Sequence, residues 1–325
     1  MTPELNTPVS IVGSKRAKIS TGSKRVGDRL KADILALRRT HSLREVAAQT
    51  GTPLGTVKTI CSRSGAFSDN QALRLLFTLP QARPSPCTAL EVPTLPPWTT
   101  VTGDTDTDVV LWLRQVISTG QPALIEKAMQ VAKRITTPLE VLEKRYTSFL
   151  VQQNPGNLMA VAFGSFGFAD LDQLAQHSIK RLTRHTEALA RFENEANLFA
   201  DTPAEQFAID ALASLKAPHK RFGQLDTNQV DKRFQAHPEL MPHTLSDCLY
   251  ELAYWDALSS LRSGADRDWP GLGVESYARE CFAYRTLARI RPKSKPEAIA
   301  VFRYLADSER MHHAETEGVL LNLIG

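Results

Sequence analysis

Proline is concentrated between residues 80 and 97, and this concentration divides the chain. The six prolines are Pro80, Pro84, Pro86, Pro93, Pro96 and Pro97, and a run of alternating Thr and Asp follows Gly103. Proline fixes its own φ and lacks an amide donor, so this density excludes a regular helix. We predict an extended linker over residues 80–108, a short unit at 25–79 and a larger domain at 109–325.

Apolar residues recur at helical spacing in many segments of the chain. The clearest runs after the linker are Val109–Ile117, Leu124–Ile135, Leu139–Val151, Leu171–Phe192, Leu245–Leu261 and Ile299–Leu323. No alternating strand pattern is convincing, although the segment Phe163–Phe168 leaves room for one short strand. The predicted fold class is all-α, with a small unit of three or four helices and a larger multi-helix domain.

Capping signals support these helices. Three starts combine a Ser or Thr with a Glu three residues later and a proline in the first turn: Thr137 with Glu140, Thr202 with Glu205 and Ser294 with Glu297. In a capping box the hydroxyl accepts from a free first-turn amide and the Glu carboxylate accepts from the amide of the capping residue. We expect a capping box at each of these three starts.

Positive charge is concentrated at the beginning of the chain. The 325 residues carry a net charge of +4. Residues 1–65 hold 12 Lys and Arg against four Asp and Glu, a net charge of +8, so the remainder sums to −4. A basic end on a mildly acidic body indicates a polyanionic partner for that end.

No targeting or membrane signal is evident. No run of about 18 apolar residues exists, so no membrane span is expected. The first ten residues lack the apolar core of a secretory signal. We expect a cytoplasmic protein associated with the nucleoid.

The sequence offers no convincing metal or cofactor site. The cysteines, which form no C-x-x-C pair and are expected to be scattered buried thiols, are Cys61, Cys87, Cys248 and Cys281. Glu309 and His312 make one E-x-x-H, whereas a carboxylate-bridged di-metal bundle needs a second such pair. We therefore expect no bound metal.

The acidic run at residues 104–108 resembles the start of a calcium loop. Asp104, Asp106 and Asp108 have the right spacing, but Val109 stands where the loop needs Gly and Gln115 where it needs Glu. Helix capping is the better interpretation. Phosphate-binding loops and nucleophile-elbow motifs are also missing, so we expect no cofactor and no enzyme activity, with an unseen active site in the helical domain as the weakest alternative.

Residues 42–65 predict two short helices joined by a tight turn. Ser42 and Glu45 form a capping box, and Gly51 follows the helix where a left-handed backbone usually ends it. Thr52 is expected to cap the second helix, and Pro53 suits its first position. A turn of about three residues makes the two helices cross steeply.

The second helix has one apolar and one polar side. Leu54, Val57 and Cys61 recur at helical spacing, with Ile60 beside them. The opposite side is small, polar and basic, and it holds Gly55, Thr56, Lys58, Thr59, Ser62 and Arg63. A preceding helix, Val26–Arg39, adds an apolar stripe, so residues 26–65 predict a three-helix unit.

Ser42–Gly65 resembles the helix-turn-helix of many bacterial regulators and recombinases. The likeness covers 24 residues, with Ala47 at the close-packing position, Gly51 at the turn and Val57 in the core; Thr52 departs from the usual aliphatic residue. It implies double-stranded DNA as partner, with helix 53–64 reading the major groove. The expected DNA-binding residues are Thr52, Pro53, Leu54, Gly55, Thr56, Lys58, Thr59, Ser62, Arg63 and Arg44. A plain helical hairpin in a protein–protein module is the alternative.

Two further basic segments are candidate nucleic-acid contacts. The first segment precedes the three-helix unit and is expected to form a flexible arm over residues 1–24. Its cations, counting the residue that follows the arm, are Lys15, Arg16, Lys18, Lys24 and Arg25. Such arms enter the minor groove in homeodomain-like proteins. The second holds Arg285, Arg289, Arg291, Lys293 and Lys295, for which a solvated helix end is the alternative.

These features favour a sequence-specific DNA-binding protein, a transcriptional regulator. The helical domain at 109–325 is expected to hold a homo-oligomer, with a dimer favoured, and to offer a surface for a protein partner. The alternative is a DNA-binding replication, partition or packaging subunit of a plasmid or phage. The long linker and the second basic segment support that alternative.

Overall fold

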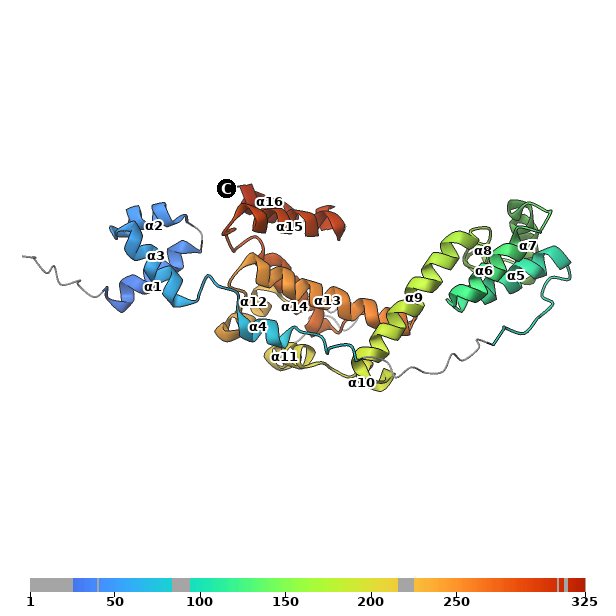
Figure 1. Cartoon of the computed structure of the whole chain (residues 1–325), viewed down its shortest axis with the longest axis horizontal. Coiled ribbons are helices and arrows are strands. Elements are labelled where there is room, and N and C mark those ends of the chain that lie inside the picture. The colour runs from blue at the N-terminus through green and yellow to red at the C-terminus, as the bar shows by residue number, and fades with distance from the viewer. Residues whose placement is uncertain are drawn as a thin grey trace, which may run out of the picture. The chain divides into compact units, whose positions relative to one another are not determined.

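The computed structural model describes residues 26–39, 41–83, 94–215, 225–308, 310–312 and 315–324. Every regular element in these ranges is a helix, which confirms the predicted all-α class (Figure 1). No helix in them is both long and apolar enough to cross a membrane. The chain divides into two compact units after Ser64.

The first unit contains three helices, each packed on the other two. They are α1 (Asp28–Arg38), α2 (Leu43–Thr50) and α3 (Leu54–Ser64). Their core is made by Ile34, Val46, Val57 and Cys61, which are all buried. The predicted apolar sides therefore meet one another, as amphipathic helices of a small bundle must.

The second unit contains the remaining helices. They are α4 (Gln71–Leu76), α5 (Thr105–Ser118), α6 (Pro122–Ala132), α7 (Leu139–Gln153), α8 (Leu158–Ser165), α9 (Leu171–Phe192), α10 (Glu195–Phe199), α11 (Pro203–Leu212), α12 (Thr227–Gln235), α13 (Leu245–Ala265), α14 (Val274–Thr286), α15 (Lys295–Asp307) and α16 (Thr316–Ile324), with short 3₁₀ turns η1 (Pro238–Leu240) and η2 (Arg310–His312). The long helices α9 and α13 pack against each other, and α13 also contacts α4, α14 and α15 (Figure 1).

Helix α4 belongs with the second unit, although the sequence placed it in a domain ending at residue 79. Phe77 is buried, and its ring packs 5.7 Å from that of Trp255 on α13. The amide of Asn70 donates to the buried carboxylate of Asp247 at 3.0 Å. Arg74 Nε donates to the same carboxylate, also at 3.0 Å. These contacts tie residues 69–77 to α13 and explain why the division falls after Ser64.

The predicted capping boxes have mixed outcomes. The Thr202–Glu205 box is confirmed at the start of α11. At Ser294 the hydroxyl accepts from the amide of Glu297, as expected, but the Glu297 carboxylate accepts from the amides of Lys293 and Ser246. The box at Thr137 is wrong. Its hydroxyl donates to Asp106 on α5 at 2.7 Å, and α7 has no side-chain cap.

Other boundaries also differ from the sequence expectations. The segment Phe163–Phe168 holds no strand, because α8 runs through Ser165. The run Ile299–Leu323 is not one helix, since η2 interrupts it between α15 and α16. Helix α5 begins at Thr105, inside the predicted linker, where the Asp104 side chain accepts from the amide of Thr107. This bond confirms the capping role of Asp104.

Candidate nucleic-acid interface

The turn between α2 and α3 is built by local bonds. Ser42 Oγ accepts from the amide of Glu45 at 3.3 Å, and the Glu45 carboxylate accepts from the amide of Ser42 at 2.6 Å. Gly51 ends α2 with φ of 62°, a left-handed conformation that favours glycine. The carbonyl of Pro53 then accepts from the amides of Thr56 and Val57, which starts α3. The predicted capping box and glycine stop are both confirmed.

Thr52 does not cap α3, contrary to the sequence prediction. Its hydroxyl donates to the carbonyl of Thr50 at 3.4 Å, and the residue is only 7% exposed. Thr52 therefore helps to close the turn, and burial removes it from the residues that can touch DNA. Of the neighbouring predicted contacts, Pro53 is exposed and Leu54 is half-buried.

The outer face of α3 has small residues in its centre and cations at its edges. We call this the α3 face, and its exposed members are Gly55, Lys58, Thr59, Ser62 and Arg63. At about 100° per residue, Ser62, Gly55 and Thr59 point along the middle, with Lys58 on one side and Arg63 on the other. The buried residues Val57 and Cys61 lie opposite. Thr56, also predicted to face outward, is half-buried.

The α3 face is positive and its cations are available. Helix α3 carries no acidic residue. Lys58, Arg63 and the exposed Arg44 at the start of α2 make no ion pair or hydrogen bond within the described ranges. The hydroxyl of Thr59 donates to the carbonyl of Gly55 at 2.9 Å, so its lone pairs remain free to accept a bond. On α1, by contrast, Lys31 is paired with Asp28 at 2.8 Å, and this lysine lowers the pKa of the Asp28 carboxyl.

The second basic segment is largely engaged within the protein. Arg285 and Arg289 both bind the carboxylate of Asp231, at 2.6 and 2.5 Å. Lys293 binds Asp69 at 3.0 Å. Of the other two predicted residues, Arg291 is half-buried and Lys295 is exposed at the start of α15. The structure therefore assigns three of the five cations to internal ion pairs, and this segment is a weaker candidate than the α3 face. The arm residues Lys15, Arg16, Lys18, Lys24 and Arg25 lie outside the described residues.

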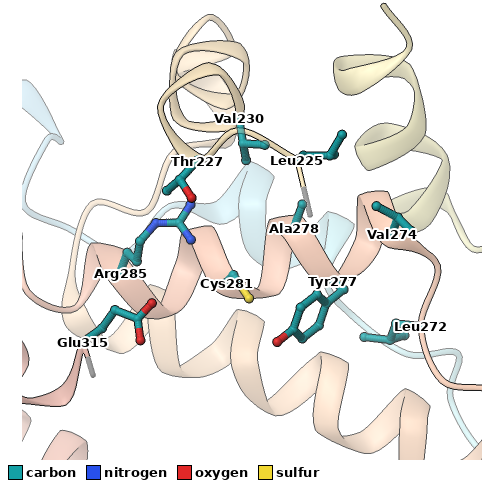
Figure 2. A pocket seen from close by; sticks show the side chains of 10 residues that line it. All are labelled: Leu225, Thr227, Val230, Leu272, Val274, Tyr277, Ala278, Cys281, Arg285 and Glu315. Atoms are coloured by element: carbon teal, nitrogen blue, oxygen red, sulfur yellow. The ribbon is translucent and has the colours of Figure 1, made fainter. Parts of the chain in front are cut away.

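A pocket of about 310 Å³ opens beside α14 in the second unit (Figure 2). Figure 2 shows Arg285 and Glu315 at one end of it and Leu272 and Val274 at the other. Cys281 also lines it, and burial raises the pKa of this thiol. A reactive cysteine needs a lowered pKa, so the raised pKa of Cys281 gives no support for a nucleophilic role of this thiol. No local pattern in the sequence predicts this pocket, because its lining comes from three separate segments, at residues 225–230, 272–285 and 315.

The other site predictions concern metals and thiols. Within the described ranges, no group of three His, Cys, Asp or Glu side chains is arranged to hold a metal ion. Asp108 is buried and accepts from the amides of Val101, Thr102 and Gly103, so it organises the loop before α5. Cys61 and Cys248 are free and buried, as expected, and Cys281 is free and partly buried, whereas Cys87 lies outside the described residues.

Comparison with known proteins gives no relative. The chain matches no protein-family model, no curated protein and no solved structure. The geometry of the α3 face is therefore the basis for any functional conclusion.

Proposed function

We propose that this chain is a sequence-specific DNA-binding protein, a transcriptional regulator whose helix α3 enters the major groove. The observation that carries the proposal is the α3 face, where small residues lie between two cations that make no ion pair within the described residues, on a helix held by a three-helix core. A major groove about 12 Å wide admits a helix with such a face.

The roles of the residues follow from their places on the face. Thr59 can accept a hydrogen bond from a base edge, and Ser62 can donate or accept one. Gly55 lets the backbone approach closely because it has no side chain. Lys58 and Arg63, at the edges, reach phosphates or guanine. Arg44 lies at the start of α2, the helix that crosses the DNA backbone in helix-turn-helix docking.

Genome-wide capture tests this proposal. The purified protein is mixed with sheared genomic DNA at ~150 mM salt, and the retained fragments are sequenced. Phosphate contacts alone give weak, sequence-blind binding, whereas base readout adds about 10³-fold or more. We expect a few sharp peaks that share a motif, and their positions would name the regulated genes.

The variant Lys58→Glu with Arg63→Glu is the control for that capture. Both side chains are exposed and unpaired in the described structure, so the variant should fold normally and lose all the peaks. Peaks retained by a folded variant would refute the role of the α3 face.

Two other functions are separate outcomes of the same capture. Uniform recovery of DNA would favour a replication, partition or packaging subunit over a regulator. No recovery at all would favour a protein–protein role for the helical hairpin. A dimer is the proposed working form, because helix-turn-helix proteins commonly gain affinity by binding two half-sites.

A further inference from the structure

Helix α8 and the end of α7 expose an unusual amount of apolar side chain. We call this region the α7–α8 surface. Its members, with exposed fractions, are Val151 (50%), Leu158 (78%), Met159 (63%), Phe163 (75%) and Phe166 (83%). Single exposed apolar residues are ordinary, but several large ones close together in the sequence, at the end of one helix and along the next, are typical of an interaction site.

The packing of α8 explains why these residues are exposed. The helix is apolar all round, yet α7 is the one helix against which it packs extensively in the described structure. Val161 is its buried residue. Gly164 lies so close to α7 that a Cβ there would come within 2.9 Å of Leu150 Cδ1. One side of α8 is therefore fixed against α7, and within the described residues no other helix packs extensively against the opposite side.

The exposed area is enough for a stable dimer. Side chains of this kind have roughly 150–200 Å² of surface each, so the five offer about 500–700 Å² per protomer. Two such surfaces in contact would bury about 1,000–1,400 Å², which reaches the size of specific interfaces.

The absence of charged residues from this surface favours a second copy of the chain as the partner. Residues 146–169 contain no Asp, Glu, Lys or Arg, and the nearest charged residues on either side are Arg145 and Asp170. In a two-fold interface each patch meets its own image, so any central charge would face a like charge. A surface without charges avoids that repulsion. It also lacks the charged groups that would select a different, charged partner.

We propose that the α7–α8 surface is the contact between two copies of this protein, which associate about a two-fold axis. Phe163 and Phe166 are the anchors, because large aromatic side chains dominate the energy of such contacts. The dimer is a property of the second unit, so its existence does not depend on DNA binding by the first.

The test is sedimentation equilibrium of the full-length protein without DNA, over about 1–100 µM. We expect a dimer for the wild type. The double variant Phe163→Ala with Phe166→Ala should weaken self-association by about 10³-fold or more, because each substitution acts twice in a symmetric interface. The variant Phe163→Glu with Phe166→Glu should be monomeric throughout the range.

Leu75→Glu is the matched control. Leu75 is 80% exposed on α4, outside the surface, so this variant should remain a dimer. Circular dichroism checks that each variant is folded. If the glutamate variant is unfolded, the alanine variant alone tests the proposed dimer contact. A monomeric wild type, or dimerisation unchanged in a folded alanine variant, would overturn the proposal. The Lys58→Glu, Arg63→Glu protein should dimerise normally, which separates this outcome from failure of the proposed DNA binding.

Discussion

Removing the two cations of the α3 face should weaken DNA binding without weakening the fold. Lys58 and Arg63 are exposed and make no ion pair in the described structure, so Lys58→Ala with Arg63→Ala should change the free energy of unfolding by no more than about 0.5 kcal/mol. A lost contact of this kind costs about 1–3 kcal/mol of binding free energy. The loss of both lowers affinity for the captured site by roughly 30-fold to 10⁴-fold.

Fluorescence anisotropy on a labelled captured site, at several salt concentrations, measures this change. If both cations contact phosphates, the slope of log K against log salt should fall by about 1.8. Arg29→Ala with Lys31→Ala on α1 is the charge-matched control. It removes the same net charge from the same unit, but Lys31 is already paired with Asp28. An equal loss in the control would mean that net charge matters and the α3 face does not. Unchanged affinity in the folded test variant would refute the reasoning.

Three further predictions concern the fold. Gly51→Ala should lower the free energy of unfolding, measured by urea denaturation, by about 1–2 kcal/mol. The φ of 62° is unfavourable for a residue with a Cβ, and the added Cβ would make no packing contact that offsets this cost. Glu251→Ala should cost about 3–5 kcal/mol in the same assay, since it leaves the fully buried Arg279 guanidinium without its carboxylate partner. Burial alone would raise the pKa of Glu205, but hydrogen bonds from Arg262 and Thr202 outweigh it and hold the pKa of this carboxyl below its ordinary 4.5. The stabilising effect of Glu205 is therefore present above pH 4.5 and is lost as the pH falls through the lowered pKa. Thermal melting between pH 6 and 3 should therefore decline less steeply for Glu205→Gln than for the wild type, and parallel declines would contradict this assignment.

The first unit was predictable because its signals are local. A capping box spans four residues, and a left-handed glycine ends its own helix, so Ser42, Glu45 and Gly51 specify the turn without help from distant residues. The alternation of Val57 and Cys61 with Lys58 and Ser62 likewise sets which side of α3 is buried. Thr52 was misplaced within this motif, because Ser or Thr before Pro can either cap a helix or close the preceding turn.

The second unit was predictable in class and not in detail. Helical periodicity identified the long helices, but it could not reveal that Thr137 bonds to Asp106 on another helix. Nor could it show that α4 packs against Trp255, far along the chain, instead of completing the first unit. Those choices depend on which distant surfaces meet, and sequence spacing holds no record of that.

The all-α class, the three-helix unit and the basic, acid-free side of α3 could all be inferred from the sequence, because each follows from the chemistry of neighbouring residues. Which charged and apolar side chains remain exposed and able to bind a partner depends on the tertiary structure. The cations Arg285 and Lys293 resemble Lys58 in sequence, yet carboxylates from distant segments neutralise them. The apolar residues of α8 look like core, yet no other helix covers them in the described structure. Availability is a property of three-dimensional packing, since a charge or an apolar side chain can bind a partner only when the fold has not already satisfied it.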